Sequence, residues 1–312
     1  MTYSSGGLIQ ASDYNTFNGA QTANVSGTLS TVLSTGRGNA GYGQSMVSNV
    51  SATGTVTATQ WTTLVNAINT VRKHQSGAGF TNIGTYTAGT TINATNNVSG
   101  NLTTAYNNRL TYAAQGSTTT GSTYSPNFTL PNQLAGATYQ MIRTVTFSSG
   151  DAARYFFNAG GQINLVVISV SNGDGTTRGA SLATLAQTNF VSKKFGAADF
   201  VARTGTGGTV NTDLTTGAGY YSLTTSDVSK CKITSGTATY TADTIELFAK
   251  SNGAQGSNAD AGSVVTLTLN LTSATQTGGF NDSINITVNY RVDIIYPSST
   301  YLTNTWGTVT IG

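Results

Sequence analysis

The chain has 312 residues, of which 38% are apolar and only 8% are charged, and about a fifth are threonine, a composition that suits a folded core under an uncharged polar surface. Its net charge of +3 forms no basic stripe, which argues against nucleic acid as a partner. No apolar run is long enough for membrane insertion, no signal peptide is visible, and the single cysteine, Cys231, excludes an internal disulfide, so we expect a protein made in a cytoplasm.

A segment near the N-terminus, residues 7–17, recurs 47 residues later as residues 54–64, with a shorter echo at 92–95. A glycine, a β-branched residue, an alanine, a hydroxyl and an aromatic residue fall in register in the two full copies. We expect each copy to be a short extended stretch followed by a helix. Ser12 or Thr59 would be the N-cap residue, because its hydroxyl can accept from a free backbone N–H.

The second copy continues into a helical pattern. Its apolar residues lie at helical spacing and predict one buried face, formed by Trp61, Leu64, Val65, Ile68 and Val71. Basic residues at 72–74 suit the negative end of the helix dipole, and Gly77 is expected to end the helix. A third helix is expected from about Leu102 to Ala113. Residues 1–115 are therefore predicted to form a small helical or α+β module with repeated capped helices.

The pattern changes from Gly116 onward. Residues 116–125 are almost all Gly, Ser and Thr and predict a linker or an exposed loop. Residues 162–170 are mostly apolar and suit a buried strand, and a final short strand is expected at 306–311.

Two further runs, 265–272 and 284–294, alternate apolar and polar residues, which is typical of half-buried strands. We expect these two runs to pair as a long antiparallel hairpin through a turn near Gly278 and Gly279. The predicted fold is mainly β, with residues 116–312 forming an antiparallel β-sandwich or jelly-roll-like domain after the N-terminal module.

Catalytic and metal sites find little support. His74 is the only histidine, which rules out a multi-histidine metal site in one chain, and its basic last turn predicts a solvated helix end. Cys231 stands between two lysines that could lower its pKa, but a buried strand thiol is the preferred interpretation. Residues 36–41 match the glycine pattern of dinucleotide sites without its βαβ context, and residues 172–175 predict a tight turn rather than a calcium loop. We expect no enzyme activity and no cofactor.

Two aromatic clusters remain as candidate binding residues, at 155–157 and at Tyr220 and Tyr221. Their rings could stack on sugars, but adjacent aromatics in a strand usually place one ring in the core, so core packing is preferred. Around the first cluster, Asp151 and Arg154 can pair locally, and glycines at 160–161 can turn the chain into the next strand. We prefer a structural corner there and keep a partner-docking surface, with Arg154 and Tyr155 as its contacts, as the alternative.

Three segments, residues 9–17, 56–69 and 150–163, resemble segments of virion structural proteins of tailed bacteriophages, especially those that infect cyanobacteria and other marine bacteria. Such proteins are described as tail-fibre-like or baseplate-associated. The resemblance implies a non-enzymatic virion component of the tail, baseplate or neck that forms homo-oligomers and contacts other virion proteins. A capsid decoration or head fibre protein, and a host-recognition adhesin that binds surface glycan, are the alternatives, and a polysaccharide depolymerase comes third. The family implies no catalytic residues.

Overall fold

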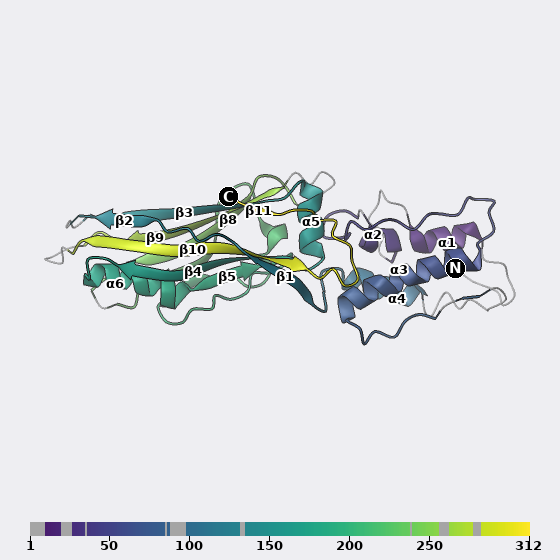
Figure 1. The fold of residues 1–312 in the computed structure, drawn as a ribbon, viewed down its shortest axis with the longest axis horizontal. Helices are drawn as coiled ribbons and strands as arrows, with labels where there is room; N and C mark the ends of the chain where they lie inside the picture. Colours follow the sequence, from purple (N-terminus) through teal and green to yellow (C-terminus); the bar gives the residue numbers. More distant parts are fainter. Residues whose placement is uncertain are drawn as a thin grey trace.

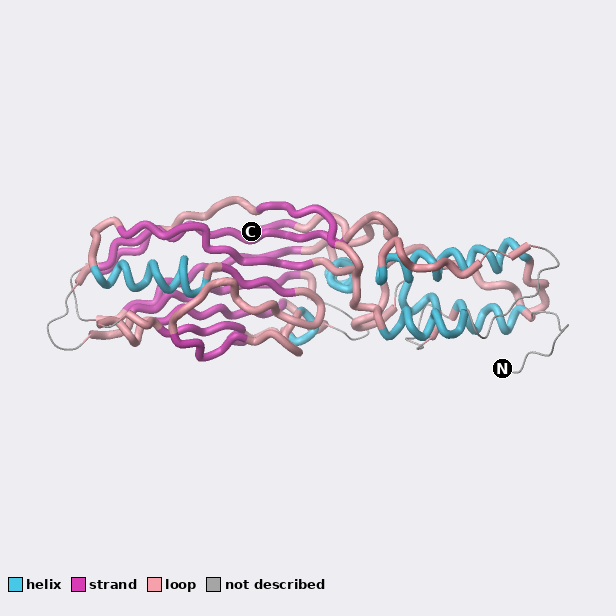
Figure 2. The backbone as a smooth tube through the Cα atoms, turned by 90° about the horizontal axis from the view of Figure 1, so that it is seen from below, coloured by secondary structure: helices cyan, strands magenta, loops and turns pink. Residues whose placement is uncertain are grey.

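The structure is a computed structural model that describes residues 10–19, 27–34, 36–84, 86–87, 98–131, 135–237, 239–255, 262–276 and 282–312. The protein is mainly β, an antiparallel sandwich with a small N-terminal helical part, as the sequence predicts. The helices of the N-terminal part and the sheets lie at opposite ends of the long axis of the molecule in both views (Figures 1 and 2). None of the described helices is both long and apolar enough to cross a membrane.

Four helices form the described N-terminal part: α1 (Ala11–Asn18), α2 (Leu29–Leu33), α3 (Ala58–Ser76) and α4 (Gly100–Asn107). The predicted apolar face of α3 is confirmed, and its Trp61 packs against the rings of Tyr14 and Phe17 from α1. Gly77 ends α3 with a φ of +86°, which glycine tolerates best. The third predicted helix is shorter than expected, because the chain turns directly after Asn107.

The predicted caps at Ser12 and Thr59 are wrong by two residues in both copies of the repeat. Helix α3 begins after Thr57, whose backbone N–H and hydroxyl exchange hydrogen bonds with Gln60. Helix α1 begins after Gln10, whose backbone N–H donates to Asp13. A capping pair three residues apart therefore starts each helix, and this spacing is a stronger signal than a hydroxyl alone. The echo at 92–95 lies outside the described residues.

Two antiparallel sheets form the sandwich. The five-stranded sheet contains β1 (Gln115–Thr120), β10 (Ile284–Pro297), β4 (Gln162–Asn172) and β5 (Ser192–Phe195), with β2 (Asn127–Leu130) also paired to β10. The six-stranded sheet contains β11 (Thr310–Ile311), β3 (Ala137–Thr146), β9 (Val264–Ser273), β8 (Thr244–Ser251), β7 (Val228–Thr234) and β6 (Thr209–Asp213). Apolar residues from the inner faces of both sheets form the core.

The alternating runs are confirmed as strands β9 and β10, but their predicted hairpin is wrong. Strand β9 pairs with β3 and β8, whereas β10 pairs with β1, β2 and β4 in the other sheet. Alternation identifies the buried face of a strand and does not identify its neighbour. The glycine pair at 278–279, expected at the hairpin turn, lies outside the described residues.

One loop expectation and one strand expectation also need correction. The Gly/Ser/Thr run after Gly116 is not a loop at its start, because β1 is an exposed edge strand paired with β10. Threonine is β-branched, so a polar run of this kind can add to a sheet edge. The final strand, β11, spans only two residues, and Trp306 before it is buried in a loop.

Helical segments close both ends of the sandwich. At the end next to the N-terminal part lies α5 (Gly150–Asn158), capped by the Ser149 hydroxyl, which accepts from the N–H of Ala152. Helix α6 (Thr177–Thr184) and a π-helical segment, Leu185–Phe190, pack against strands of both sheets. Helix α6 lies towards the end remote from the N-terminal helices (Figure 1).

Candidate functional site

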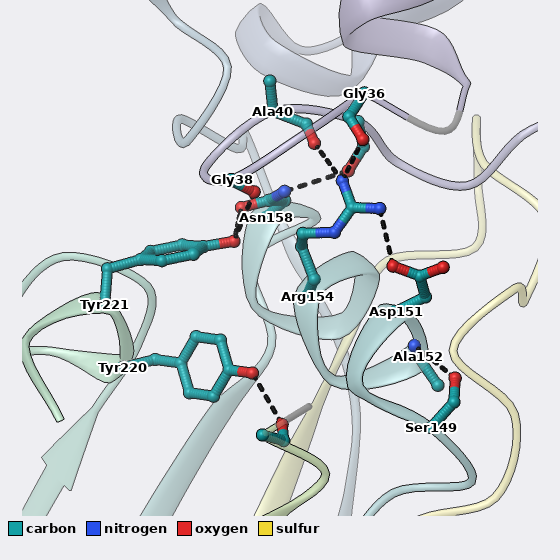
Figure 3. A network of polar contacts seen from close by, with 12 residues as sticks. Gly36, Gly38, Ala40, Ser149, Asp151, Ala152, Arg154, Asn158, Tyr220 and Tyr221 are labelled. Carbon is teal, nitrogen blue, oxygen red and sulfur yellow. Dashed lines mark hydrogen bonds and ion pairs between the residues drawn. The ribbon is translucent and has the colours of Figure 1, made fainter. Parts of the chain in front are cut away.

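Three of the four predicted binding residues, Arg154, Tyr220 and Tyr221, lie near one another where the sandwich meets the helical part (Figure 3). The fourth, Tyr155, follows Arg154 on the same helix. Arg154 and Tyr155 belong to α5, and Tyr220 and Tyr221 belong to a short 3-10 turn, Tyr220–Ser222. Neither aromatic pair is in a strand, so the interpretation of adjacent strand rings is wrong. Facing them is the glycine loop, residues 36–43 of the helical part. These three segments are called the junction below.

Arg154 is buried and ties α5 to the glycine loop. Its Nη1 donates to the carbonyl oxygens of Gly36 at 2.5 Å and Ala40 at 2.8 Å (Figure 3). Its Nη2 donates to Asp151 Oδ1 at 2.8 Å, one turn earlier on the same helix. A buried guanidinium is costly to leave without acceptors, so these contacts fix the loop against the helix.

Asn158 and Tyr221 extend the same network by one more helical turn. Asn158 Nδ2 donates to the carbonyl of Gly41 at 3.0 Å. The Tyr221 hydroxyl lies 2.8 Å from Asn158 Oδ1 and 3.0 Å from the carbonyl oxygen of Gly38. Four backbone carbonyls of the glycine loop therefore face polar side chains of the sandwich (Figure 3).

The glycines of the loop are required by its shape and by close approach to α5. Gly43 has a φ of +70°, and a Cβ there would lie 2.4 Å from the Tyr155 ring. Gly41 has a φ of +94°, and its Cβ would lie 2.6 Å from the carbonyl oxygen of Ser34. The glycine pattern that resembles a dinucleotide motif therefore serves here to let backbone carbonyls reach Arg154.

Tyr155 and Tyr220 are buried at the junction and do not offer free ring faces. The Tyr220 ring stacks on Phe157 with centroids 4.2 Å apart, and its hydroxyl donates to the carbonyl of Gly262 at 2.9 Å. Tyr220 has 0% of its surface exposed, so it provides no platform for a soluble glycan in this conformation. Sugar stacking needs an exposed ring, and the junction instead uses these aromatics as packing.

His74 also lies at the junction, and the prediction of a solvated helix end is wrong for it. It is 2% exposed, and its Nε2 lies 3.1 Å from the carbonyl oxygen of Ala159, the residue that follows α5. Because a carbonyl only accepts, Nε2 carries the proton of a neutral ring. Burial lowers the pKa of His74 to about 4, partly offset by this hydrogen bond.

Further contacts beside the network join the same two parts. Gln44 exchanges hydrogen bonds with Thr303 through its side-chain amide, and Thr305 Oγ1 donates to the carbonyl of Tyr42 at 2.8 Å. Gln162 at the start of β4 donates to the Tyr112 hydroxyl at 2.8 Å. The helical part is therefore attached to the sandwich at several separate points.

Elsewhere in the sandwich, burial and ion pairing keep the Cys231 thiol and a nearby lysine unreactive. Burial, with nearby Asp213, raises the pKa of Cys231 to about 11, so the thiol stays protonated; the flanking lysines do not activate it. Lys193 is buried and ion-paired with Asp213. Among the described residues, no group of three His, Cys, Asp or Glu side chains could hold a metal ion.

The predicted pairing of Arg154 with Asp151 is confirmed, but its partners in the glycine loop could not be predicted, because backbone carbonyls carry no residue signature. It also missed Asn158 and the role of the glycine loop. The available signal was Ser149 before a run ending in three aromatics, which indicates a capped helix.

Searches against protein-family models, curated proteins and solved structures each returned no match for this chain.

Proposed function

We propose that the chain is a structural subunit of a tailed-phage virion, located in the tail, baseplate or neck, that acts by protein–protein assembly. The observation that carries the proposal is the junction, where buried polar side chains fix the helical part in line with the sandwich (Figures 1 and 3). A subunit that holds neighbours at a set spacing needs such a rigid connection between its ends. The resemblance of residues 9–17, 56–69 and 150–163 to virion proteins supplies the type of particle.

The surface of the sandwich supports the same proposal. Strand β1 is exposed along its whole length at an edge of the five-stranded sheet, and it contains no charged residue. An uncharged edge can pair with a strand of a neighbour without desolvating ions. In this proposal the helical part attaches the subunit to the particle, and the sandwich projects from it or joins a ring of copies.

The junction favours assembly over glycan recognition as the role of the predicted binding residues. Arg154 and Tyr155 are buried within the chain, and the Tyr221 hydroxyl points to the Gly38 carbonyl of the helical part. These residues therefore support the proposal by making the subunit rigid, while contacts with other virion proteins fall on other surfaces.

The proposal is tested by following the chain through particle purification. An epitope-tagged copy is expressed in infected host cells, and virions are isolated on a density gradient. We expect the tag to co-sediment with particles in a fixed ratio to the major head protein, and gold-labelled antibody to mark the tail, baseplate or neck. A similarly tagged non-virion phage enzyme, which should stay at the top of the gradient, is the control. Recovery of the chain only in the soluble fraction would overturn the proposal, and labelling of the head would overturn the proposed location.

A further inference from the structure

The outer face of the six-stranded sheet is mainly polar, and most outward side chains of its central strands are exposed or half-buried. The outward positions of β3, β9 and β8 lie in cross-strand register and alternate with buried residues. They are Thr138, Gln140, Ile142 and Thr144 on β3, Thr266, Thr268, Asn270 and Thr272 on β9, and Thr244, Glu246, Phe248 and Lys250 on β8. We call this set the threonine face.

The centre of the threonine face is apolar. Ile142 is 49% exposed and lies opposite Thr268, which on its other side lies opposite the half-buried Phe248. Thr268 points outward and yet is only 5% exposed, because it stands between these two larger side chains. The face therefore has an apolar centre and a polar rim, which is the usual arrangement of a protein interface.

The charges on and beside this face are paired within the chain. Lys232 of β7 lies 3.1 Å from Glu246, and Lys250 lies 3.0 Å from Asp227. The two basic and two acidic groups sum to no net charge. A second threonine face can therefore cover this one without like-charge repulsion, whereas a strongly charged partner would find no complementary field.

The dimensions suit a pair of identical faces. The three strands of the face, β3, β9 and β8, about 4.8 Å apart and about nine residues long at about 3.4 Å per residue, give roughly 440 Å² of area. Two copies then bury roughly 900 Å² in total, in the range of weak, transient interfaces. A two-fold axis near the centre would place Ile142 of each copy against the apolar centre of the other.

We propose that two copies of this chain associate face to face through their threonine faces, with Ile142 and Phe248 at the centre of the interface. This inference is independent of the virion proposal, since a dimer can form in solution whether or not the chain enters particles, and particle entry needs no such dimer. The small area predicts a dimer that dissociates on dilution.

The test is the solution mass of the full chain, measured by size-exclusion chromatography with light scattering from about 1 µM to about 500 µM. We expect the mass to rise with concentration from 32.1 kDa towards twice that value. Ile142→Glu should keep the chain monomeric and weaken association at least about tenfold, because two buried carboxylates would meet at the interface. Ile168→Glu is the matched control, since Ile168 is 42% exposed on β4 of the other sheet and should leave the dimer unchanged.

A second variant guards against a folding defect at position 142. Gln140→Lys adds a charge at an exposed position of the same face and should also weaken association, with an unchanged circular dichroism spectrum. A wild-type chain that stays monomeric at the highest concentration overturns the proposal. Equal association of the Ile142→Glu, Gln140→Lys and Ile168→Glu chains also overturns it, and would point to another surface such as the β1 edge.

Discussion

Two buried arginines occupy opposite ends of the sandwich. Both donate hydrogen bonds to backbone carbonyls, but they connect different parts of the chain. Arg154 is 3% exposed beside the helical part, and Arg178 of α6 is 0% exposed at the remote end. Among the described residues, the acceptors of Arg178 belong to the sandwich and include the carbonyls of Ala135, Ala274 and Asp282 and the hydroxyl of Ser273. The carbonyl acceptors of Arg154 belong to the helical part.

A buried guanidinium can therefore either close a domain or couple two domains, depending on which segments supply its acceptors. Arg178 joins the ends of strands that come from both sheets, so its contacts exist only when the sandwich is complete. Arg154 joins two parts that each have apolar residues of their own in the core. The two arginines should therefore differ in how their loss affects unfolding.

The largest effect is expected from Arg178→Met. Methionine fills similar space but leaves three carbonyls and a hydroxyl without their donor in a buried site, so the free energy of unfolding should fall by about 3–5 kcal/mol. Urea unfolding followed by circular dichroism measures the change. Lys194→Met on β5, which is only partly buried, is the control and should shift stability by less than about 0.5 kcal/mol. A loss below about 1 kcal/mol for Arg178→Met would show that the far end closes without this arginine.

A smaller effect is expected from Arg154→Met, which should separate the helical part from the sandwich rather than unfold either one. We expect a loss of about 3 kcal/mol and, in scanning calorimetry, two transitions where the wild-type chain gives one. Asp151→Asn is the matched control. Its carboxylate is 60% exposed, so the salt bridge adds little, and the variant should lose less than about 1 kcal/mol and keep one transition. A single, merely shifted transition in Arg154→Met would mean that other junction contacts are sufficient for coupling.

Elements with strong periodicity could be predicted from the sequence. Elements whose structure depends on distant packing or pairing partners could not. Helix α3 and strands β9 and β10 could be identified because each buries one face over many residues. The assignment of β9 and β10 to different sheets could not be predicted, because the alternating pattern of each strand fits any apolar neighbour. Helix α5 was missed because three consecutive aromatics suggest a strand, and only packing on several sides explains them.

The junction could be predicted only on one side. The pair of Arg154 and Asp151 was predicted, but the two carbonyl acceptors of Arg154 lie 118 and 114 residues away along the chain. A backbone carbonyl can belong to any residue type, so no spacing rule selects Gly36 or Ala40. The glycine pattern of the loop was visible, and its purpose became clear only once α5 lay against it.

A third prediction tests the junction through pH. The unfolded chain protonates His74 as the pH falls below about 6.5, whereas the folded chain does so only near 4, because the buried ring stays neutral. Folding stability should therefore fall as the pH drops through this window, by about 2–3 kcal/mol in total. His74→Gln lacks this dependence. The measurement is the difference in the free energy of unfolding between the wild type and this variant at pH 7 and at pH 4.5. The contributions of the aspartates are common to both chains and cancel. A difference that does not change with pH would place His74 in solvent.

The smallest effect is expected from a change in the shape of the glycine loop. It tests the close contact between Gly43 and the Tyr155 ring separately from the hydrogen bonds of Arg154. Gly43→Ala keeps every polar group but needs a φ near +70° and moves a methyl group into the Tyr155 ring, so it should cost about 1–2 kcal/mol. Gly79→Ala is the matched control, because a Cβ there meets nothing within 4 Å. If Gly43→Ala lowers the calorimetric transition and begins to split it while Gly79→Ala does neither, the contact between loop and helix transmits the coupling together with Arg154. Equal behaviour of the two alanine variants would instead assign the coupling to the buried arginine network alone, and the glycines would then matter only for bringing the carbonyls within its reach.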